Sequence, residues 1–312
     1  MKRKNFLLLF VFILGVGAIL SLSVSDLSFL QPPQELIELS VIIRDSDSST
    51  WSAARQGMDQ AAGDLGVELR FLALTTANST EEQRTLLHRE VEVGTDGVIL
   101  VPANPAALAE DVKLASEKTV IVTMESDMSS SGSTACISAD NAELGKALAN
   151  AALDGVPPGG TVLLLDSSPG STGIQARINA AAEVLEQSGR LILRYSITDT
   201  TEMNWENPPQ AVLTFEATVL EQMSLQLQGK SNAPLLYGMG ATNTIAAGLE
   251  QGTIAAIAAQ NEFTAGYLAV EEAVRAATGK PLIPLSTMKF FMLNRSNMYQ
   301  LENQKLLFPV TR

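Results

Sequence analysis

The sequence predicts an α/β fold in which parallel sheets are divided between two domains. Three apolar runs end in acidic or small polar residues: 96–104 (DGVILVPAN), 119–127 (TVIVTMESD) and 161–170 (TVLLLDSSPG). Parallel strands buried on both faces have this pattern at their carboxyl ends, which is the sheet edge where α/β proteins bind ligands. Helix-like stretches separate the runs, and more than four such βα units exceed one comfortable core. Two domains are therefore expected.

Nine strands follow from the apolar runs, and the segment around Cys136 (TACISAD) predicts one more. The nine are expected at Leu36–Ile43, Val67–Leu74, Val98–Val101, Val120–Met124, Val162–Leu165, Leu191–Tyr195, Val212–Phe215, Leu235–Tyr237 and Ile254–Ala259. Helices are expected in most of the gaps, with right-handed crossovers. The stretch 137–141 (ISADN) ends one α/β set and begins another, so it is the predicted crossing between the domains.

One connection is too short for a normal crossover. Only Ser196–Gln210 separates two strands of the second domain, and it contains Pro208 and Pro209. A parallel connection needs roughly a dozen residues or more, usually with a helix. The crossover helix is predicted to be truncated or absent, which would leave that sheet partly uncovered.

Composition and charge limit the class of protein. With 312 residues, 46% hydrophobic and 18% charged, the chain is predicted to be folded and globular. Its formal net charge of −13 argues against a nucleic-acid surface, because such a surface needs a basic face.

The amino terminus predicts export. A basic MKRK start precedes an uncharged apolar run at 6–22, of about 17 residues, which is at the lower limit for a spanning helix. A cleaved signal peptide and a retained anchor both fit. Because no Ala-x-Ala site and no lipid-anchor cysteine follows, we favour an anchor with the globular part outside the cytoplasm.

The single cysteine and the single histidine predict neither a disulfide within the chain nor a zinc site. Cys136 is the only cysteine, so no disulfide can form within the chain, and we expect a small buried hydrophobe. His88, the only histidine, lies in a helix that Ser79 and Glu82 open with a capping-box pattern. With no other histidine or cysteine to join it, no zinc site is expected, and no metal or cofactor is predicted.

Six segments in order carry a family resemblance: DGVILVPAN, VIVTMESD, ISADNAELG, LLLDSSPGSTGIQARINA, LLYGMGATNTIAAGLEQGTIAAIAAQ and GYLAVEEAV. Together they resemble the type 1 periplasmic sugar-binding proteins, the ribose-binding-protein-like family, over 36–312. The carboxyl end, NMYQLENQKLLFP, is similar to membrane-anchored members from Gram-positive bacteria, some encoded beside sensor kinases.

This resemblance implies two Rossmann-like lobes with parallel sheets, joined by a three-segment hinge and closing over a sugar. Residues 1–35 would be the signal or anchor and linker. The N-terminal lobe would comprise 36–139 and 262–289, and the C-terminal lobe 140–261 and 290–312.

The resemblance also implies sugar-binding residues. Ser48 and Trp51 follow the first strand, where the family has a polar ligand and aromatic rings that stack on sugars. Glu125 matches an acidic residue that accepts sugar hydroxyls, and Arg177 matches an arginine whose fork donates to two of them. A surface tryptophan, a solvated acid and a helix-surface ion pair are the alternatives.

Three further residues complete the predicted set. Gln260 matches a family glutamine at the hinge, and Asn141, beside Asp140, lies at another crossing. For these, hinge structure is as good an interpretation as ligand contact. Glu216 takes a position where the family often has Asn.

Two departures from the family pattern concern its sugar-binding groups. Ser126 follows Glu125 where the family often has arginine, and Gly238-Met239-Gly240 replaces a Gly-Phe-Asp. Each lost hydrogen bond is worth about 1 kcal/mol net. A different ligand or weaker sugar binding is therefore expected, and a non-sugar, autoinducer-like small molecule is the alternative.

Three classes of function were weighed: a binding protein for an ABC importer, a ligand-sensing ectodomain for a membrane histidine kinase, and an enzyme. No nucleophile elbow, metal cluster or histidine-based constellation is present, so no enzyme is predicted. The apolar amino terminus stands where a repressor would have its helix-turn-helix. The missing lipid-anchor cysteine favours sensing over import.

Overall fold

A computed structural model describes residues 36–46, 49–132, 134–197, 203–204 and 206–307. Residues 37–312 form one compact unit, separate from 1–36. Ser48 and the apolar run at 6–22 lie outside the described residues. In the part that is described, no helix is both long and apolar enough to cross a bilayer.

The first sheet contains six strands in the order β11-β5-β4-β3-β1-β2, all paired in parallel. Its central strands are buried on both faces, as their unbroken apolar sequences require. The strands are β1 (Glu38–Ile42), β2 (Glu68–Leu72), β3 (Gly97–Leu100), β4 (Val120–Met124), β5 (Thr134–Ala139) and β11 (Leu285–Met288).

The second sheet has the order β12-β10-β9-β8-β6-β7. Its strands are β6 (Thr161–Asp166), β7 (Leu191–Ser196), β8 (Ala211–Thr214), β9 (Leu235–Met239), β10 (Ala256–Gln260) and β12 (Phe290–Asn294). Five of them are parallel, whereas β12 runs antiparallel to β10 at the edge. The sheets are thus mostly parallel, in agreement with the predicted fold class, and the second has one antiparallel strand at its edge.

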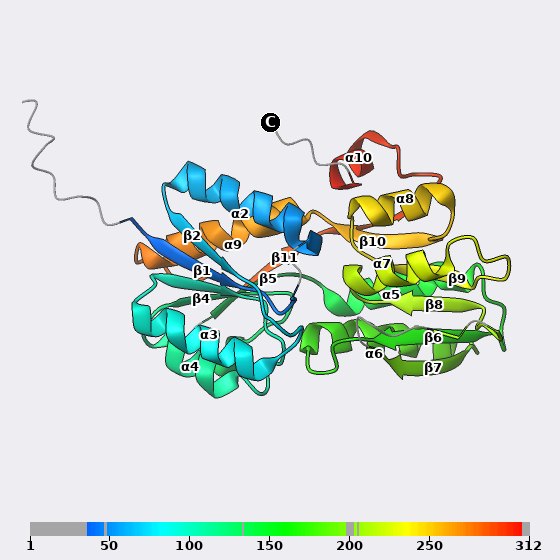
Figure 1. Cartoon of the computed structure of the whole chain (residues 1–312), viewed down its shortest axis with the longest axis horizontal. Coiled ribbons are helices and arrows are strands. Elements are labelled where there is room, and N and C mark those ends of the chain that lie inside the picture. Colours follow the sequence, from blue (N-terminus) through cyan, green and yellow to red (C-terminus); the bar gives the residue numbers. More distant parts are fainter. Residues whose placement is uncertain (1–35, 47–48, 133, 198–202, 205, 308–312) are drawn as a thin grey trace, which may run out of the picture. The chain divides into compact units, whose positions relative to one another are not determined.

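Helices cover both faces of each sheet (Figure 1). On the first sheet, α2 (Ser52–Leu65) packs beside α9 (Glu262–Ala277), while α3 (Thr80–Val93) and α4 (Ala109–Ser116) pack together on the other face. This sheet and these helices are called the N-lobe.

The second sheet and its helices are called the C-lobe. One face carries α5 (Asn141–Leu153) against α6 (Thr172–Gln187), and the other carries α7 (Ala217–Leu227) and α8 (Asn243–Gln251). A last helix, α10 (Leu301–Leu307), contacts β10, and two short 3-10 helices, η2 (Ser49–Trp51) and η3 (Ser129–Ser131), lie in the N-lobe.

The chain passes between the lobes three times: after β5, after β10, and between β11 and β12. The first two passages each lead directly into a helix capped by a polar side chain, since Asp140 accepts from Glu143 N and Asn261 from Thr264 N. These passages form the expected three-segment hinge of a type 1 periplasmic binding protein fold.

All ten predicted strands are present, but β11 and β12 were not predicted. They have four and five residues, stand at the edges of different sheets and are separated only by Lys289. No apolar run marks such short edge strands.

Part of the short connection between β7 and β8, residues 198–202 and 205, lies outside the described residues. The part that is described contains no helix. Leu191, Leu193 and Tyr195, alternate residues of β7, are 60%, 53% and 50% exposed.

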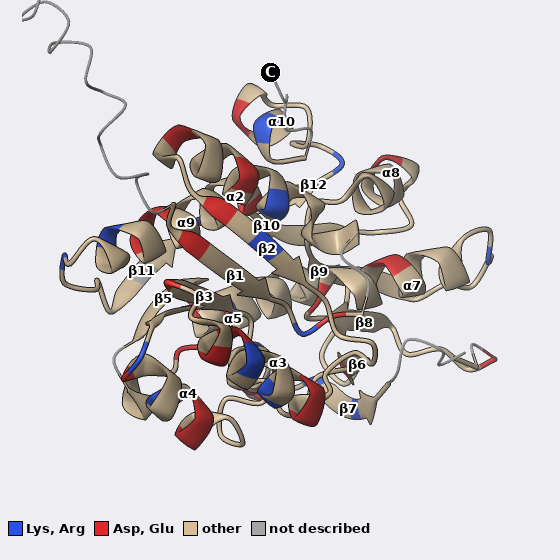
Figure 2. Cartoon of the chain, turned by 60° about the vertical axis from the view of Figure 1, so that its left-hand side comes forward, with Lys and Arg blue, Asp and Glu red and all other residues tan. Residues whose placement is uncertain are grey.

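Two isolated residues also match expectation. Cys136 is fully buried in β5, and burial raises the pKa of its thiol to about 11. His88 lies on exposed α3, where Nε2 is 2.7 Å from Asp111 Oδ1. Acidic residues are spread over helices of both lobes (Figure 2), and no group of described residues could hold a metal ion.

Candidate functional site

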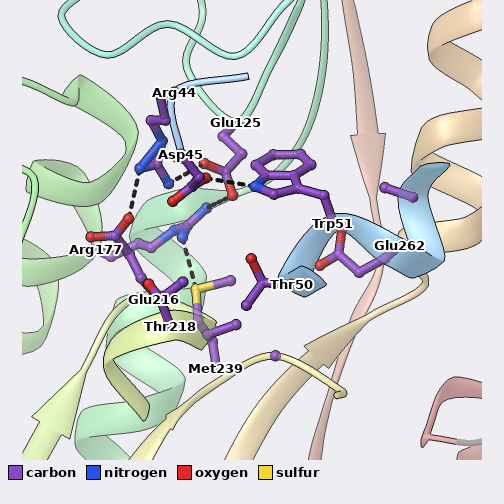
Figure 3. Close-up of a pocket in the computed structure, with 13 residues that line it drawn as sticks. Arg44, Asp45, Thr50, Trp51, Glu125, Arg177, Glu216, Thr218, Met239 and Glu262 are labelled. Atoms are coloured by element: carbon purple, nitrogen blue, oxygen red, sulfur yellow. Dashed lines mark hydrogen bonds and ion pairs between the residues drawn. The ribbon is translucent and has the colours of Figure 1, made fainter. Parts of the chain in front are cut away.

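Strand ends of both lobes meet at a cavity. From the N-lobe, Arg44 and Asp45 follow β1, and Glu125 follows β4. From the C-lobe, Glu216 follows β8 and Met239 ends β9. Trp51, Arg177 of α6 and Glu262 of α9 complete the charged and aromatic lining (Figure 3). The free volume is about 50 Å³, well below the roughly 300 Å³ at which ligand pockets begin.

A larger cavity of about 650 Å³ adjoins the first and shares four lining residues with it: Thr50, Ala217, Gly240 and Glu262. Its lining is rich in hydroxyl and amide groups from the start of α2, the start of α8 and α9, including Ser52, Gln56, Thr242, Asn243 and Asn261. Together the two cavities provide the volume that a small polar molecule requires.

Arg44 joins the two lobes through ion pairs. Its Nη1 is 2.6 Å from Glu216 Oε1 in the C-lobe, and its Nη2 is 2.8 Å from Glu125 Oε2 in the N-lobe. Ser167 and Ser168 also donate to Glu216. Burial raises the pKa of Glu216, but the charge of Arg44 and the serine hydrogen bonds outweigh it, so the pKa lies below its ordinary value. This pairing holds the cleft closed.

Arg177 is almost completely buried, with 1% of its surface exposed. Its Nε donates to Asn141 Oδ1 at 2.7 Å, and its Nη1 donates to Phe215 O at 3.0 Å and to Met239 Sδ at 2.7 Å. Its Nη2 lies 3.9 Å from Glu125 Oε1, too far for a hydrogen bond. One amino group of the fork is thus available to a ligand.

Glu125 has a left-handed backbone, with φ of 65°. Such a conformation is uncommon outside glycine and is stored at sites where surrounding structure enforces it. Here Asn141 Nδ2 and Ser138 Oγ donate to Glu125 O at 2.8 and 3.1 Å. The strained residue directs its carboxylate toward both guanidinium groups.

Trp51 lines the cavity rather than lying on the surface, being 8% exposed. Its Nε1 donates to Asp45 Oδ2 at 2.6 Å, and the ring packs in the apolar core between α2, α9 and the first sheet. Burial raises the pKa of Asp45 to about 6, although the charge of Arg44 opposes the shift.

Glu262 begins α9 at the junction of the two cavities. Gln260 Nε2 donates to its Oε1 at 3.0 Å. Burial, followed by repulsion from Glu125, raises the pKa of Glu262 to about 7. Gln260 itself is 7% exposed, and its Oε1 has no hydrogen-bond partner among the described residues.

The lobes approach each other at the start of α6. Gly173 N donates to Ser126 Oγ at 3.1 Å, and a Cβ on Gly173 would stand 2.5 Å from Glu125 O. A Cβ on Gly170 would stand 3.1 Å from Ala103 O. The glycines of this turn therefore allow the two lobes to pack closely.

Four of the predicted site residues line the cavity: Trp51, Glu125, Arg177 and Glu216. Asn141 lies behind Arg177 and Gln260 behind Glu262, each positioning a lining residue. Ser48 falls outside the described residues.

Sequence reasoning missed Arg44, Asp45 and Glu262. The first two follow the apolar run of β1 as Glu125 follows that of β4, so the same rule could have found them. Arg44 supplies a guanidinium group beside Glu125, at 2.8 Å. Nothing in the pattern of the first helical turn distinguishes Glu262 from an exposed acid.

Solved structures support the fold. A carbohydrate transporter solute-binding protein from Agrobacterium radiobacter, in complex with D-arabinose, aligns with a TM-score of 0.80 at 17% identity, covering 88% of this chain and 99% of that one. An ABC transporter solute-binding protein from Agrobacterium vitis with bound D-fucose gives 0.80 at 18%, covering 87% and 100%. The XylFII–LytSN complex gives 0.75 at 17%, covering 84% and 98%.

Curated proteins contain no match to this sequence. The family model described as a periplasmic binding protein domain matches residues 39–281, which includes every charged residue of the cavity. The chain therefore belongs to the periplasmic binding protein domain family.

Proposed function

We propose that this protein binds a monosaccharide or a similarly small polar ligand between its lobes and presents it to a membrane partner. The observation that carries the proposal is the cavity where Trp51, two guanidinium groups and four carboxylates meet from strand ends of both lobes. Such a set suits hydroxyl-rich ligands, because carboxylates accept from hydroxyls, guanidinium groups donate to them, and an indole face packs against a sugar ring.

Binding would require the lobes to move. The inner cavity holds about 50 Å³, and Arg44 is paired with Glu125 and Glu216 across it. A ligand would replace part of this network, with Arg177 Nη2 and Glu125 as nearby polar groups. Ligand contacts from both lobes would then favour the closed state in the bound protein.

The cellular location and the membrane partner of the protein are proposed from its family and from similar structures rather than from the cavity. Family membership favours an extracytoplasmic position, and we propose that the apolar segment at 6–22 anchors the chain in the membrane. A sensor kinase and an ABC importer are both candidate partners: two of the similar structures are named as transporter proteins, and one is a complex of XylFII with LytSN.

Thermal unfolding tests the ligand. In a panel of pentoses and hexoses, a ligand at about 100 times its dissociation constant should stabilise the protein by roughly 2.7 kcal/mol. Glycerol at equal concentration is the control for nonspecific stabilisation. If no sugar in the panel shifts the transition of demonstrably folded protein, sugar binding is refuted.

A further inference from the structure

The charges in the inner cavity do not balance. Among the described residues that line it, the ionisable groups are Arg44 and Arg177 against Asp45, Glu125, Glu216 and Glu262. With all of them ionised, the cavity carries two more negative than positive charges. Buried charge without a partner is costly, so this excess requires protons or a cationic ligand.

The two guanidinium groups lie next to the other two acids. Arg44 lies 2.6 Å from Glu216 and 2.8 Å from Glu125, and Arg177 also approaches Glu125. Asp45 and Glu262 form no ion pair with a described residue. Their hydrogen bonds come from neutral groups, Trp51 Nε1 and Gln260 Nε2. Burial raises the pKa of both carboxyls, to about 6 and about 7, and the charges of Arg44 and Arg177 offset this rise only in part.

Unpartnered polar atoms next to these acids indicate a ligand. Arg44 lines the cavity with 3% of its side chain exposed, and its Nε has no acceptor among the described residues. Gln260, which bonds to Glu262, has a buried Oε1 without a donor. Arg44 Nε could donate to a ligand hydroxyl oxygen, whereas Gln260 lines neither cavity and acts through its hydrogen bond to Glu262.

Trp51 adds a third element, because its ring lines the same cavity as the two acids, and an indole face attracts cations. No set of His, Cys, Asp and Glu side chains in the described part of the chain could hold a metal ion, so an inorganic cation is not favoured. The net charge of −13 would also raise the local concentration of cationic ligands.

We propose that the ligand is a small polyol with a protonated amine, such as an amino sugar, whose ammonium group pairs with Glu262 beside Trp51, with Asp45 as a second acid of the same cavity. This inference rests on the proposed function, because it specifies the chemistry of the ligand in the same cavity. The hydroxyls of the ligand meet Arg44 and Arg177, and its amine supplies the positive charge that the cavity lacks.

Calorimetry at pH 7 tests the proposal with the full-length chain in mild detergent. The probes are D-glucosamine, D-glucose and N-acetyl-D-glucosamine, with the matching galactose and mannose series and a panel of neutral pentoses. In at least one series the amine should bind roughly tenfold or more tightly than its neutral parent and its acetylated form, because charge-assisted hydrogen bonds are the stronger ones.

Two further readouts separate charge from shape. Glu262→Gln should reduce the preference for the amine to less than about threefold, since it removes the carboxylate that pairs with it. Glu110→Gln, at an acid on α4 that is 72% exposed, should leave the preference unchanged. Binding of the amine should also release protons from Asp45 and Glu262, seen as heats that differ between buffers of different ionisation enthalpy.

The outcomes are distinct. Tighter binding of the amine with proton release supports the inference. If neutral sugars bind as tightly as the amines, or bind when no amine does, the inference is overturned and the proposed sugar-binding function stands. If nothing in any series or in the neutral panel binds to folded protein, both fail. The wild-type comparison decides even if Glu262→Gln does not fold.

Discussion

Among single residues, Arg44 is expected to contribute most to the stability of the folded protein, because its side chain neutralises carboxylates of both lobes. Replacing it by Met would leave Glu216 and Glu125 without their nearest cation. Removing one partner of a buried ion pair costs about 3 to 5 kcal/mol. We expect Arg44→Met to lower the free energy of unfolding by that amount in urea denaturation.

The control for Arg44 is Arg55→Met on α2, whose pair with Asp59 is exposed and 3.9 Å long. Such a pair is worth about 0 to 1 kcal/mol. Adding Glu216→Leu to Arg44→Met should recover part of the loss, because the uncompensated carboxylate is then removed. Equal stability of Arg44→Met and Arg55→Met would contradict the ion-pair account.

Glu262 predicts a pH dependence of stability. Its pKa is raised from 4.5 to about 7 in the folded protein, so between these values the folded state binds more protons than the unfolded state. Stability from this group is therefore full below about pH 4.5 and is lost as pH rises through 7. At pH 8 we expect Glu262→Gln to be more stable than the wild type. At pH 5 the difference in stability between the two should be smaller.

Urea denaturation at pH 5, 6, 7 and 8 measures this difference. Glu110→Gln, which changes an exposed acid in the same way, should follow the wild-type curve at all four values. A constant difference between Glu262→Gln and the wild type across the range would show that burial does not hold the proton on Glu262.

At the scale of elements, the start of α6 fixes how closely the lobes approach. A Cβ on Gly173 would stand 2.5 Å from Glu125 O and 3.0 Å from Ser126 Oγ. Gly173→Ala should therefore push the lobes apart, which small-angle scattering would detect as a larger radius of gyration. Gly63→Ala on α2, where a Cβ meets nothing within 4 Å, is the control.

The control should gain up to about 1 kcal/mol, since alanine is the better helix former. If Gly173→Ala keeps the radius of gyration of the wild type and gains as much stability as Gly63→Ala, the close approach of the lobes at the start of α6 is contradicted.

Strand β7 lies at the edge of the second sheet and has exposed apolar side chains. Leu193 is 53% exposed on β7, whereas Leu163 of the adjacent β6 is 5% exposed in the core under α7 and α8. Leu193→Ala should cost less than about 1 kcal/mol and Leu163→Ala about 2 to 5 kcal/mol in urea denaturation. Similar costs would mean that other residues cover β7.

For the whole molecule, the sequence predicted the class of fold and ten of its strands. Buried parallel strands leave long apolar runs, and the family resemblance pointed to Glu125 and Glu216 at the ends of two of them. The edge strands β11 and β12 were missed because four or five partly exposed residues leave no such run. The antiparallel direction of β12 depends on its pairing with β10, which no local pattern encodes.

The ion pairs inside the cavity could not be predicted from local sequence patterns either. Arg44 and Glu216 are 172 positions apart in the chain and meet only once both lobes are folded. Whether an acid such as Glu262 faces solvent or a cavity depends on elements from the other lobe. Local sequence can thus identify polar strand ends, but tertiary structure decides which of them neutralise each other.

The central claim is that a small polar ligand binds between the lobes. A crystal structure of the protein with the tightest-binding sugar or amino sugar tests it most directly. We predict ligand density between Trp51 and Arg177, with the Arg44–Glu216 contact rearranged. Density bound elsewhere, with the cavity still filled by the ion pairs seen here, would contradict the account.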